Sequence, residues 1–385
     1  MSYTPKPLKR AYGLNEIALV PSNKTIDLDM VDIRTTIGGV TLDIPIIASA
    51  MDSVVNPNTA GILGHHGALG ILNLEGVQTR YDHPDEILDK IASVSKADYV
   101  SLMQDIYKKN AVRDDLVKQR IQEIKAKNIP VAVSSTPQNA AHLGPISADA
   151  GADLFLIQST VISPNFHAKD EKKALDLTQF CSDMTIPVLA GNTTTYEVTY
   201  ELLKTGIQGI FVGIGPGAAC TTRGVLGIGV PMATSIIDCV AARDDYERET
   251  GRYVPLIADG GIVNSGDICK ALACGADAVM IGSPIARAEE APGRGFHWGM
   301  ATPNAVLPRG ARIEVGQVAS LDTIMVGPSH SDDGSQNFRG AIETCFATLG
   351  AETMKEMHGI EVVIAPSLLT EGKIYQKAQS LGMYK

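Results

Sequence analysis

The chain has 385 residues, of which 44% are hydrophobic, so it can bury a large core within one domain of α/β-barrel size. Its formal net charge of −10 and the lack of a basic stripe exclude nucleic acid as an expected ligand. No apolar run is as long as a membrane span, and residues 1–16 lack the apolar core of a signal peptide. We therefore expect no membrane partner and a cytoplasmic location. The six cysteines are scattered without metal-ligand spacing, so structural zinc is not expected.

Short apolar runs alternate with helical patterns along most of the chain. Most of the runs consist of consecutive apolar residues and do not alternate with polar ones, as expected for parallel strands that are buried on both faces. Turns such as Gly151-Ala-Asp153 and Gly275-Ala-Asp277 lead directly into the runs that follow them. The predicted strands are, in chain order, Ile44–Ala50, Ala68–Leu72, Pro130–Ser134, Leu154–Gln158, Pro187–Ala190, Gly209–Gly213, Leu256–Asp259 and Ala278–Ile281.

Helical patterns lie between and after these strands. The long tract Asn73–Asn128 is charged and contains two of them, with no sign of a folded insert. The repetition of strand, helix and glycine turn favours a closed (β/α)8 TIM barrel over an open doubly wound sheet. We predict a single α/β domain over residues 1–385, with an N-terminal extension and a C-terminal tail. The predicted helices are Asn56–Gly64, Pro84–Val94, Val112–Lys127, Pro137–Ala150, Thr195–Lys204, Asp267–Cys274 and Gly340–Glu356.

The run Gly213–Arg223 after the sixth predicted strand is the main candidate for chemistry, because active sites of such barrels lie at the C-terminal ends of the strands. This run is too rich in glycine to pack as core, and Cys220 within it is followed by two hydroxyl side chains and Arg223. Nearby donors and a cation favour the thiolate form of a cysteine, so Cys220 is a candidate nucleophile. A cysteine such as Cys239 is more typically a buried, inert side chain.

The residues after the last two strands indicate a phosphate site. Asp259-Gly-Gly261 follows the seventh strand and Gly282-Ser283 follows the eighth, and loops at these places commonly bind phosphate. Because the chain is acidic, backbone N–H groups would hold the phosphate, and Asp259 could accept two ribose hydroxyls. Trp298, in the loop that follows, has two open roles: it could cover a bound base or plug the top of the barrel.

The run GIGPGAACTTR at Gly213–Arg223 resembles the signature loop of the IMP dehydrogenase/GMP reductase family, in which the cysteine is the nucleophile. The motifs NEIALVPS, IPIIASAMDSV, IPVLAGN, IADGGI, GADAVMIGSP and HWGMA match in the same order and extend the likeness over most of the chain. The resemblance is closest to the IMP-dehydrogenase-related proteins that lack the paired CBS module. Dehydrogenases carry that module where this chain has only the tract Asn73–Asn128.

The resemblance implies a set of roles at the site. In the family the cysteine attacks C2 of the purine, and a hydride moves between C2 and the nicotinamide of NAD or NADP. By this likeness Cys220 and Thr222 are catalytic, and a monovalent cation, with potassium as the candidate, is expected on the carbonyls of Gly215, Gly217 and Cys220. We expect cofactor contacts at Gln158, Ser159 and Gly213. The implied substrate contacts are Ser49, Met51, Asn192, Asp259, Gly261, Gly282, Ser283, Gly299 and Met300.

Two positions depart from the family pattern. An aspartate follows the fourth strand in the dehydrogenases, whereas this chain has Gln158. The family's Pro-Glu-Gly or Ser-Glu-Gly, whose glutamate partners the catalytic threonine, is Pro308-Arg309-Gly310 here. Glu314 is the candidate replacement for that glutamate.

The segment after Met300 favours one reaction direction. IMP dehydrogenases have a long flap there that supplies an Arg-Tyr pair to activate water, whereas only Ala301–Leu307 precedes Pro308 in this chain, without such a pair. We therefore predict NADPH-dependent reductive deamination of GMP to IMP and ammonia, by a homotetramer or homo-octamer. The alternatives are NAD-dependent oxidation of IMP to XMP, a flavin-dependent barrel enzyme, and a non-catalytic nucleotide-binding regulatory protein.

Overall fold

A closed barrel of parallel strands forms the centre of the molecule. The computed structural model describes residues 7–167, 169, 174–300, 311–365 and 372–382. The strands follow the order β10-β11-β4-β5-β6-β7-β8-β9 around the barrel, and β9 pairs with β10 to close it. The barrel strands are β4 (Ile46–Ala48), β5 (Leu69–Asn73), β6 (Ala132–Ser135), β7 (Leu154–Gln158), β8 (Val188–Thr193), β9 (Ile210–Val212), β10 (Leu256–Asp259) and β11 (Ala278–Ile281).

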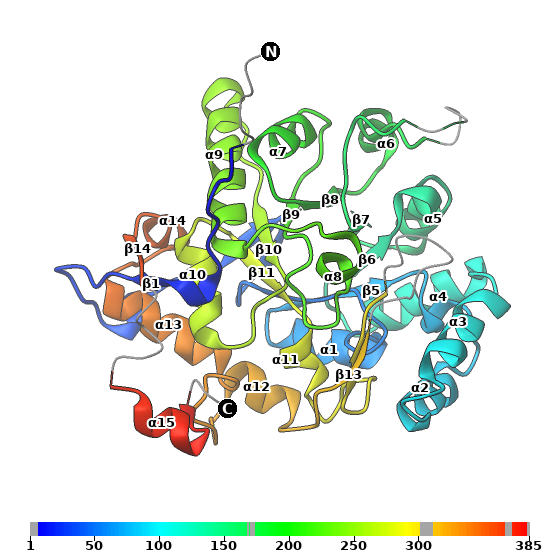
Figure 1. Ribbon diagram of the computed structural model, residues 1–385. Coiled ribbons are helices and arrows are strands. Elements are labelled where there is room, and N and C mark those ends of the chain that lie inside the picture. The colour runs from blue at the N-terminus through cyan, green and yellow to red at the C-terminus, as the bar shows by residue number, and fades with distance from the viewer. Residues whose placement is uncertain (1–6, 168, 170–173, 301–310, 366–371, 383–385) are drawn as a thin grey trace, which may run out of the picture.

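This architecture confirms the predicted (β/α)8 barrel, and each predicted strand overlaps a barrel strand. Helices surround the strands, as Figure 1 shows. Within the described ranges, no helix is long and apolar enough to cross a membrane. The surrounding helices are α1 (Pro57–His65), α4 (Asp114–Lys125), α5 (Pro137–Ala150), α6 (Leu177–Asp183), α7 (Tyr196–Leu203), α9 (Met232–Thr250), α10 (Ser265–Ala273), α12 (Leu321–Val326) and α13 (Phe338–Leu349).

An N-terminal hairpin contributes to the core inside the barrel. Strands β2 (Thr35–Ile37) and β3 (Val40–Leu42) pair around a two-glycine turn, and the Ile37 and Leu42 side chains are fully buried against the barrel interior. A Cβ on Gly38 would come within 2.6 Å of Leu154 Cδ2, so this turn fits tightly against the strands. Farther out, β1 (Ile17–Leu19) pairs with β14 (Val362–Ile364), which joins the two ends of the chain.

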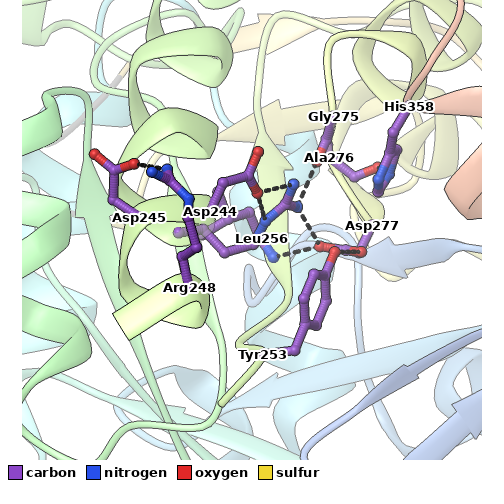
Figure 2. A network of polar contacts seen from close by, with 10 residues as sticks. Asp244, Asp245, Arg248, Tyr253, Leu256, Gly275, Ala276, Asp277 and His358 are labelled. Carbon is purple, nitrogen blue, oxygen red and sulfur yellow. Dashed lines mark hydrogen bonds and ion pairs between the residues drawn. The ribbon is translucent and has the colours of Figure 1, made fainter. Parts of the chain in front are cut away.

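The Gly-Ala-Asp turns explain how helices are connected to the strands that follow. The Asp277 carboxylate accepts the Leu256 N–H at 2.8 Å, and Asp153 accepts the Val131 N–H in the same way at 2.8 Å. Around Asp277 the contacts extend into a polar network (Figure 2), in which the buried Arg243 and the exposed Tyr253 also donate to the carboxylate. Each aspartate thus ties the start of its own strand to the start of the preceding one.

A helical pair formed by α2 (Pro84–Ser93) and α3 (Tyr99–Lys109) lies between β5 and α4, within the tract expected to have no folded insert. Figure 1 shows the pair at the periphery of the barrel. Trp298 on β12 (Phe296–Trp298) is fully buried against this pair, and its Nε1 donates to the Tyr107 hydroxyl at 3.1 Å. This position favours a packing role for Trp298 over covering a base. The remaining elements are η1 (Leu14–Glu16), η2 (Leu28–Met30), η3 (Val77–Thr79), α8 (Thr222–Leu226), α11 (Ser283–Ala286), β13 (Arg312–Glu314), α14 (Met354–Met357) and α15 (Ile374–Gln379).

Candidate active site

A cavity of about 860 Å³ opens at the C-terminal ends of the barrel strands. Every barrel strand, or the loop that follows it, contributes to its wall, as expected for a site in this fold. The predicted site residues that the structure brings together here are Ser49, Met51, Gln158, Ser159, Asn192, Gly213, Gly215, Gly217, Cys220, Thr222, Asp259, Gly261, Gly282, Ser283, Gly299 and Met300.

Cys220 lies in the loop between β9 and α8, where its side chain is exposed to the cavity. Its Sγ donates to Thr222 Oγ1 at 3.2 Å, and Thr222 itself is buried. The Gly217 carbonyl accepts the Cys220 N–H at 3.0 Å, which closes the turn before the thiol. A reactive thiol needs access to its substrate and a group that handles its proton, and this pair provides both.

Arg223 braces the loop from the other side. Its Nη2 donates to the Val230 carbonyl at 3.0 Å, so the side chain connects the beginning of α8 to the segment after it. The aliphatic part of the Arg223 side chain packs closely against two glycines. A Cβ on Gly215 would lie 2.6 Å from Arg223 Cγ, and a Cβ on Gly229 would lie 2.8 Å from the same atom. The glycines of the loop therefore make room for an arginine that holds it in shape.

Backbone amides gather at the ends of β10 and β11. Within the described part of the chain, the N–H groups of Gly261, Gly282 and Ser283 have no hydrogen-bond acceptor. Gly261 has φ +73°, and a Cβ there would lie 2.9 Å from Pro216 Cβ, so glycine is needed for this backbone path. Free amides that point to a cavity are what an anion such as a phosphate requires.

Asp259 lies between these amides and the strands β7 and β8. Its Oδ2 accepts from Asn192 Nδ2 at 2.7 Å and from Gln158 Nε2 at 3.1 Å. Burial raises the pKa of the Asp259 carboxyl to about 6, and the two amides act in the opposite direction because they stabilise the charged form. A carboxylate in this place can accept the hydroxyls of a sugar.

His297 closes the cavity beside the β11 loop. Its Nδ1 shares a hydrogen bond of 2.9 Å with Ser53 Oγ, and burial lowers the pKa of the ring to about 4. The imidazole is therefore neutral at ordinary pH. A Cβ on Gly282 would lie 3.1 Å from this ring, so Gly282 allows the histidine to approach the free amides.

The cavity wall also contains residues that sequence reasoning did not single out. Glu75 follows β5, and its carboxylate accepts the Thr136 N–H at 2.5 Å and the Asn139 side-chain amide. Arg80 donates through Nε to the Glu75 carbonyl at 2.9 Å. Glu75 lies three residues after the second predicted strand and Thr136 lies two residues after the third, so the segments that leave these strands contain a signal for both.

Glu314 does not line the cavity; it is exposed on β13, opposite Phe296. Arg312 on the same strand donates to the Ile91 and Val94 carbonyls at the end of α2, so it has a structural role. The segment Ala301–Gly310, which contains Arg309 and the short connection that bears on reaction direction, lies outside the described residues.

The fold and the cavity define the class of the molecule as a (β/α)8 barrel with a ligand cavity at the C-terminal ends of its strands. The sequence pattern of the IMP dehydrogenase/GMP reductase domain matches residues 11–302. The chain belongs to the IMP dehydrogenase/GMP reductase family and is an oxidoreductase.

Individual relatives agree with this family. A protein named an uncharacterized oxidoreductase from Mycolicibacterium smegmatis is 37% identical over 365 residues, which cover 92% of this chain and 97% of that one. An inosine-5′-monophosphate dehydrogenase from Cryptosporidium parvum is 32% identical over 75% of this chain and 71% of its own length. The crystal structure of an IMP dehydrogenase/GMP reductase-like protein from Corynebacterium glutamicum superposes with a TM-score of 0.87 and 36% identity, covering 94% of this chain and 96% of that one.

Proposed function

We propose that this oxidoreductase reduces GMP to IMP and ammonia with NADPH, through a covalent intermediate on Cys220. The observation that carries the proposal is one cavity that contains the Cys220 thiol, bonded to Thr222, and the free amides at the ends of β10 and β11. A purine nucleotide with its phosphate on those amides and its ribose on Asp259 would extend its base toward the Cys220 loop.

The chemistry divides into bond changes that this chain can support. The Cys220 thiolate adds to C2 of the guanine ring, and Thr222 is positioned to relay the proton that the thiol loses. The C2–N bond then breaks, and the amino group takes up the proton that the thiol lost and leaves as ammonia. NADPH supplies a hydride when it is bound. After C2 has received that hydride, the C–S bond breaks and the thiolate of Cys220 is regenerated with IMP as product.

The cofactor would occupy the part of the cavity bounded by the ends of β6 to β9. Ser159 and Gly213 line it together with Gln158, and Glu75 and Thr136 form the adjoining wall. Their polar groups suit the ribose and carboxamide of a nicotinamide nucleotide.

A potassium ion on the carbonyls of Gly215, Gly217 and Cys220 is a further part of this proposal. The Gly217 carbonyl already accepts one N–H, which leaves its second lone pair for a cation. Equal turnover in potassium and in a bulky organic cation would remove the ion from the proposal.

Reaction direction is the main point to test. Hydrolysis of a Cys-bound intermediate needs an activated water, and Arg312, which already donates to backbone carbonyls, is a poor base. Purified protein should oxidise NADPH only when GMP is present, and the products should be IMP and ammonia. The absorbance of the nicotinamide would measure NADPH oxidation, and chromatography would identify the nucleotide product. Conversion of IMP to XMP with NAD, without turnover of GMP, would reverse the direction. Tight binding of GMP with neither reaction would indicate a regulatory protein.

A further inference from the structure

Gln158, at the end of β7, belongs to a polar triad that crosses three strands of the barrel. Its Nε2 donates to Asp259 Oδ2 at 3.1 Å and to Asn192 Oδ1 at 3.2 Å. Asn192, on β8, uses its Nδ2 to donate to the same Asp259 oxygen at 2.7 Å and to the Gly213 carbonyl at 2.8 Å. The triad therefore links Gln158, on the proposed cofactor side of the cavity, to Asp259, on the proposed nucleotide side.

The donors of this triad are fully used. A side-chain amide has two N–H groups, and both groups of Gln158 and both groups of Asn192 have acceptors. The two bonds to Asp259 converge on Oδ2, whereas Oδ1 receives no hydrogen bond from any described residue. Oδ1 is thus the carboxylate oxygen left for a ligand, and Gln158 can offer a cofactor only its carbonyl oxygen.

We propose that Gln158 is a positioning residue: by donating to Asp259 Oδ2 it orients the carboxylate so that Oδ1 accepts a sugar hydroxyl of the bound nucleotide. This inference deepens the proposed function and rests on it for the identity of the ligand. It replaces the expectation that Gln158 is a cofactor contact with a role exerted through Asp259.

The ionisation of Asp259 also supports a positioning role for Gln158. Burial disfavours its ionised form, and the amides of Asn192 and Gln158 are the groups that counteract burial. The other titratable side chains that line the cavity are Glu75, Arg80, Cys220 and His297, and none of these four is hydrogen-bonded to the Asp259 carboxylate. Without the Gln158 donor, the carboxylate should need a higher pH to ionise.

The test compares Gln158→Met, which removes the donor, with Gln158→Glu, which places a second negative charge about 3 Å from Asp259. The matched control is Gln138→Met, the same substitution in the same cavity wall without a hydrogen bond to Asp259. Calorimetry would follow GMP and IMP binding between about pH 5 and 8, with Asp259→Asn as the reference that lacks the titration. Infrared difference spectra of the protonated Asp259 carboxyl would give the ionisation midpoint without any ligand.

We expect the midpoint to rise by about one pH unit in Gln158→Met, to rise further in Gln158→Glu, and to stay in place in Gln138→Met. GMP binding at about pH 6 should then weaken by roughly fivefold in Gln158→Met, because the ionised fraction of Asp259 falls from about one half to about one tenth, with little change in the KM for NADPH. An unchanged midpoint in Gln158→Met, with a higher KM for NADPH, would overturn the positioning role. If the unmodified protein binds neither nucleotide, the proposed function fails, while the infrared midpoints still decide the role of Gln158.

Discussion

Asp259→Asn should make the ligand-free protein more stable while impairing nucleotide binding. Burial raises the pKa of this carboxyl from 3.8 to about 6, so the folded protein keeps the proton at pH values where the unfolded chain has lost it. Stability therefore falls as the pH rises from about 4 to 6, and the full penalty is present above that range. Asparagine keeps an oxygen that can accept from Gln158 and Asn192, but it carries no charge to bury.

The size of the effect follows from the same shift. A displacement of about two pKa units corresponds to about 3 kcal/mol at pH 8 and to about half of that at pH 5. Asp259→Asn should recover up to this amount, so its gain in unfolding free energy should about double between these two pH values. Urea unfolding of the ligand-free protein at both pH values would measure it, with Asp238→Asn, on the exposed face of α9, as the control.

When GMP is bound, we expect the unmodified protein to be more stable than Asp259→Asn, which is the reverse of the order without ligand. GMP should stabilise the unmodified protein by mass action, whereas Asp259→Asn should bind it roughly tenfold to a hundredfold more weakly because a charged hydrogen bond is lost. Without ligand at pH 8, the unfolding free energy of Asp259→Asn should exceed that of the unmodified protein. An equal or lower value would refute the inference that the buried Asp259 charge destabilises the fold and is kept for nucleotide binding.

Three further predictions concern the nucleophile, the phosphate loop and the packing of α2 and α3. Cys220→Ala should abolish turnover and leave GMP affinity largely intact; a residual rate above a few per cent would contradict covalent catalysis. Gly261→Ala should weaken GMP binding, because φ +73° and the approach to Pro216 oppose a Cβ, whereas Gly224→Ala, with open space around it, should bind normally in the same calorimetric assay. Trp298→Ala should lower the unfolding free energy by about 3–5 kcal/mol, since it empties a buried site; a loss under 1 kcal/mol in urea titrations would show that α2 and α3 do not depend on it.

The barrel strands could be predicted because each is a short apolar run, and several, such as those at Leu154 and Ala278, begin directly after a glycine turn. Helix α9 was missed, although Met232, Ile236, Cys239 and Tyr246 form its buried stripe, because charged residues interrupt the pattern. The β2–β3 hairpin has a local signal in Gly38-Gly39 between β-branched residues, a pattern typical of a tight hairpin turn. The β1–β14 pair could not be read from local patterns, because its register depends on the finished fold.

The site shows the same division between local and long-range information. The Cys220 loop and the glycines after β10 and β11 are local signals, and the structure places them around one cavity. The contact between Gln158 and Asp259 joins residues on different strands, and its geometry follows from the closed barrel. No spacing rule in the sequence would have paired them. Sequence reasoning therefore identified which residues enter the cavity, while the structure identified which of them act on one another.

Closure of the barrel has a consequence for synthesis on the ribosome. Strand β4 pairs on one side with β5 and on the other with β11, through Ile46 and Val279. At about 5–20 residues per second, β11 emerges on the order of ten to fifty seconds after β4. During that interval one edge of β4 lacks its partner, and the Ile37–Leu42 hairpin lacks the strands that bury it. The nascent chain therefore exposes an apolar hairpin and an open strand edge, both of which chaperones can bind, until residues close to 281 have been added.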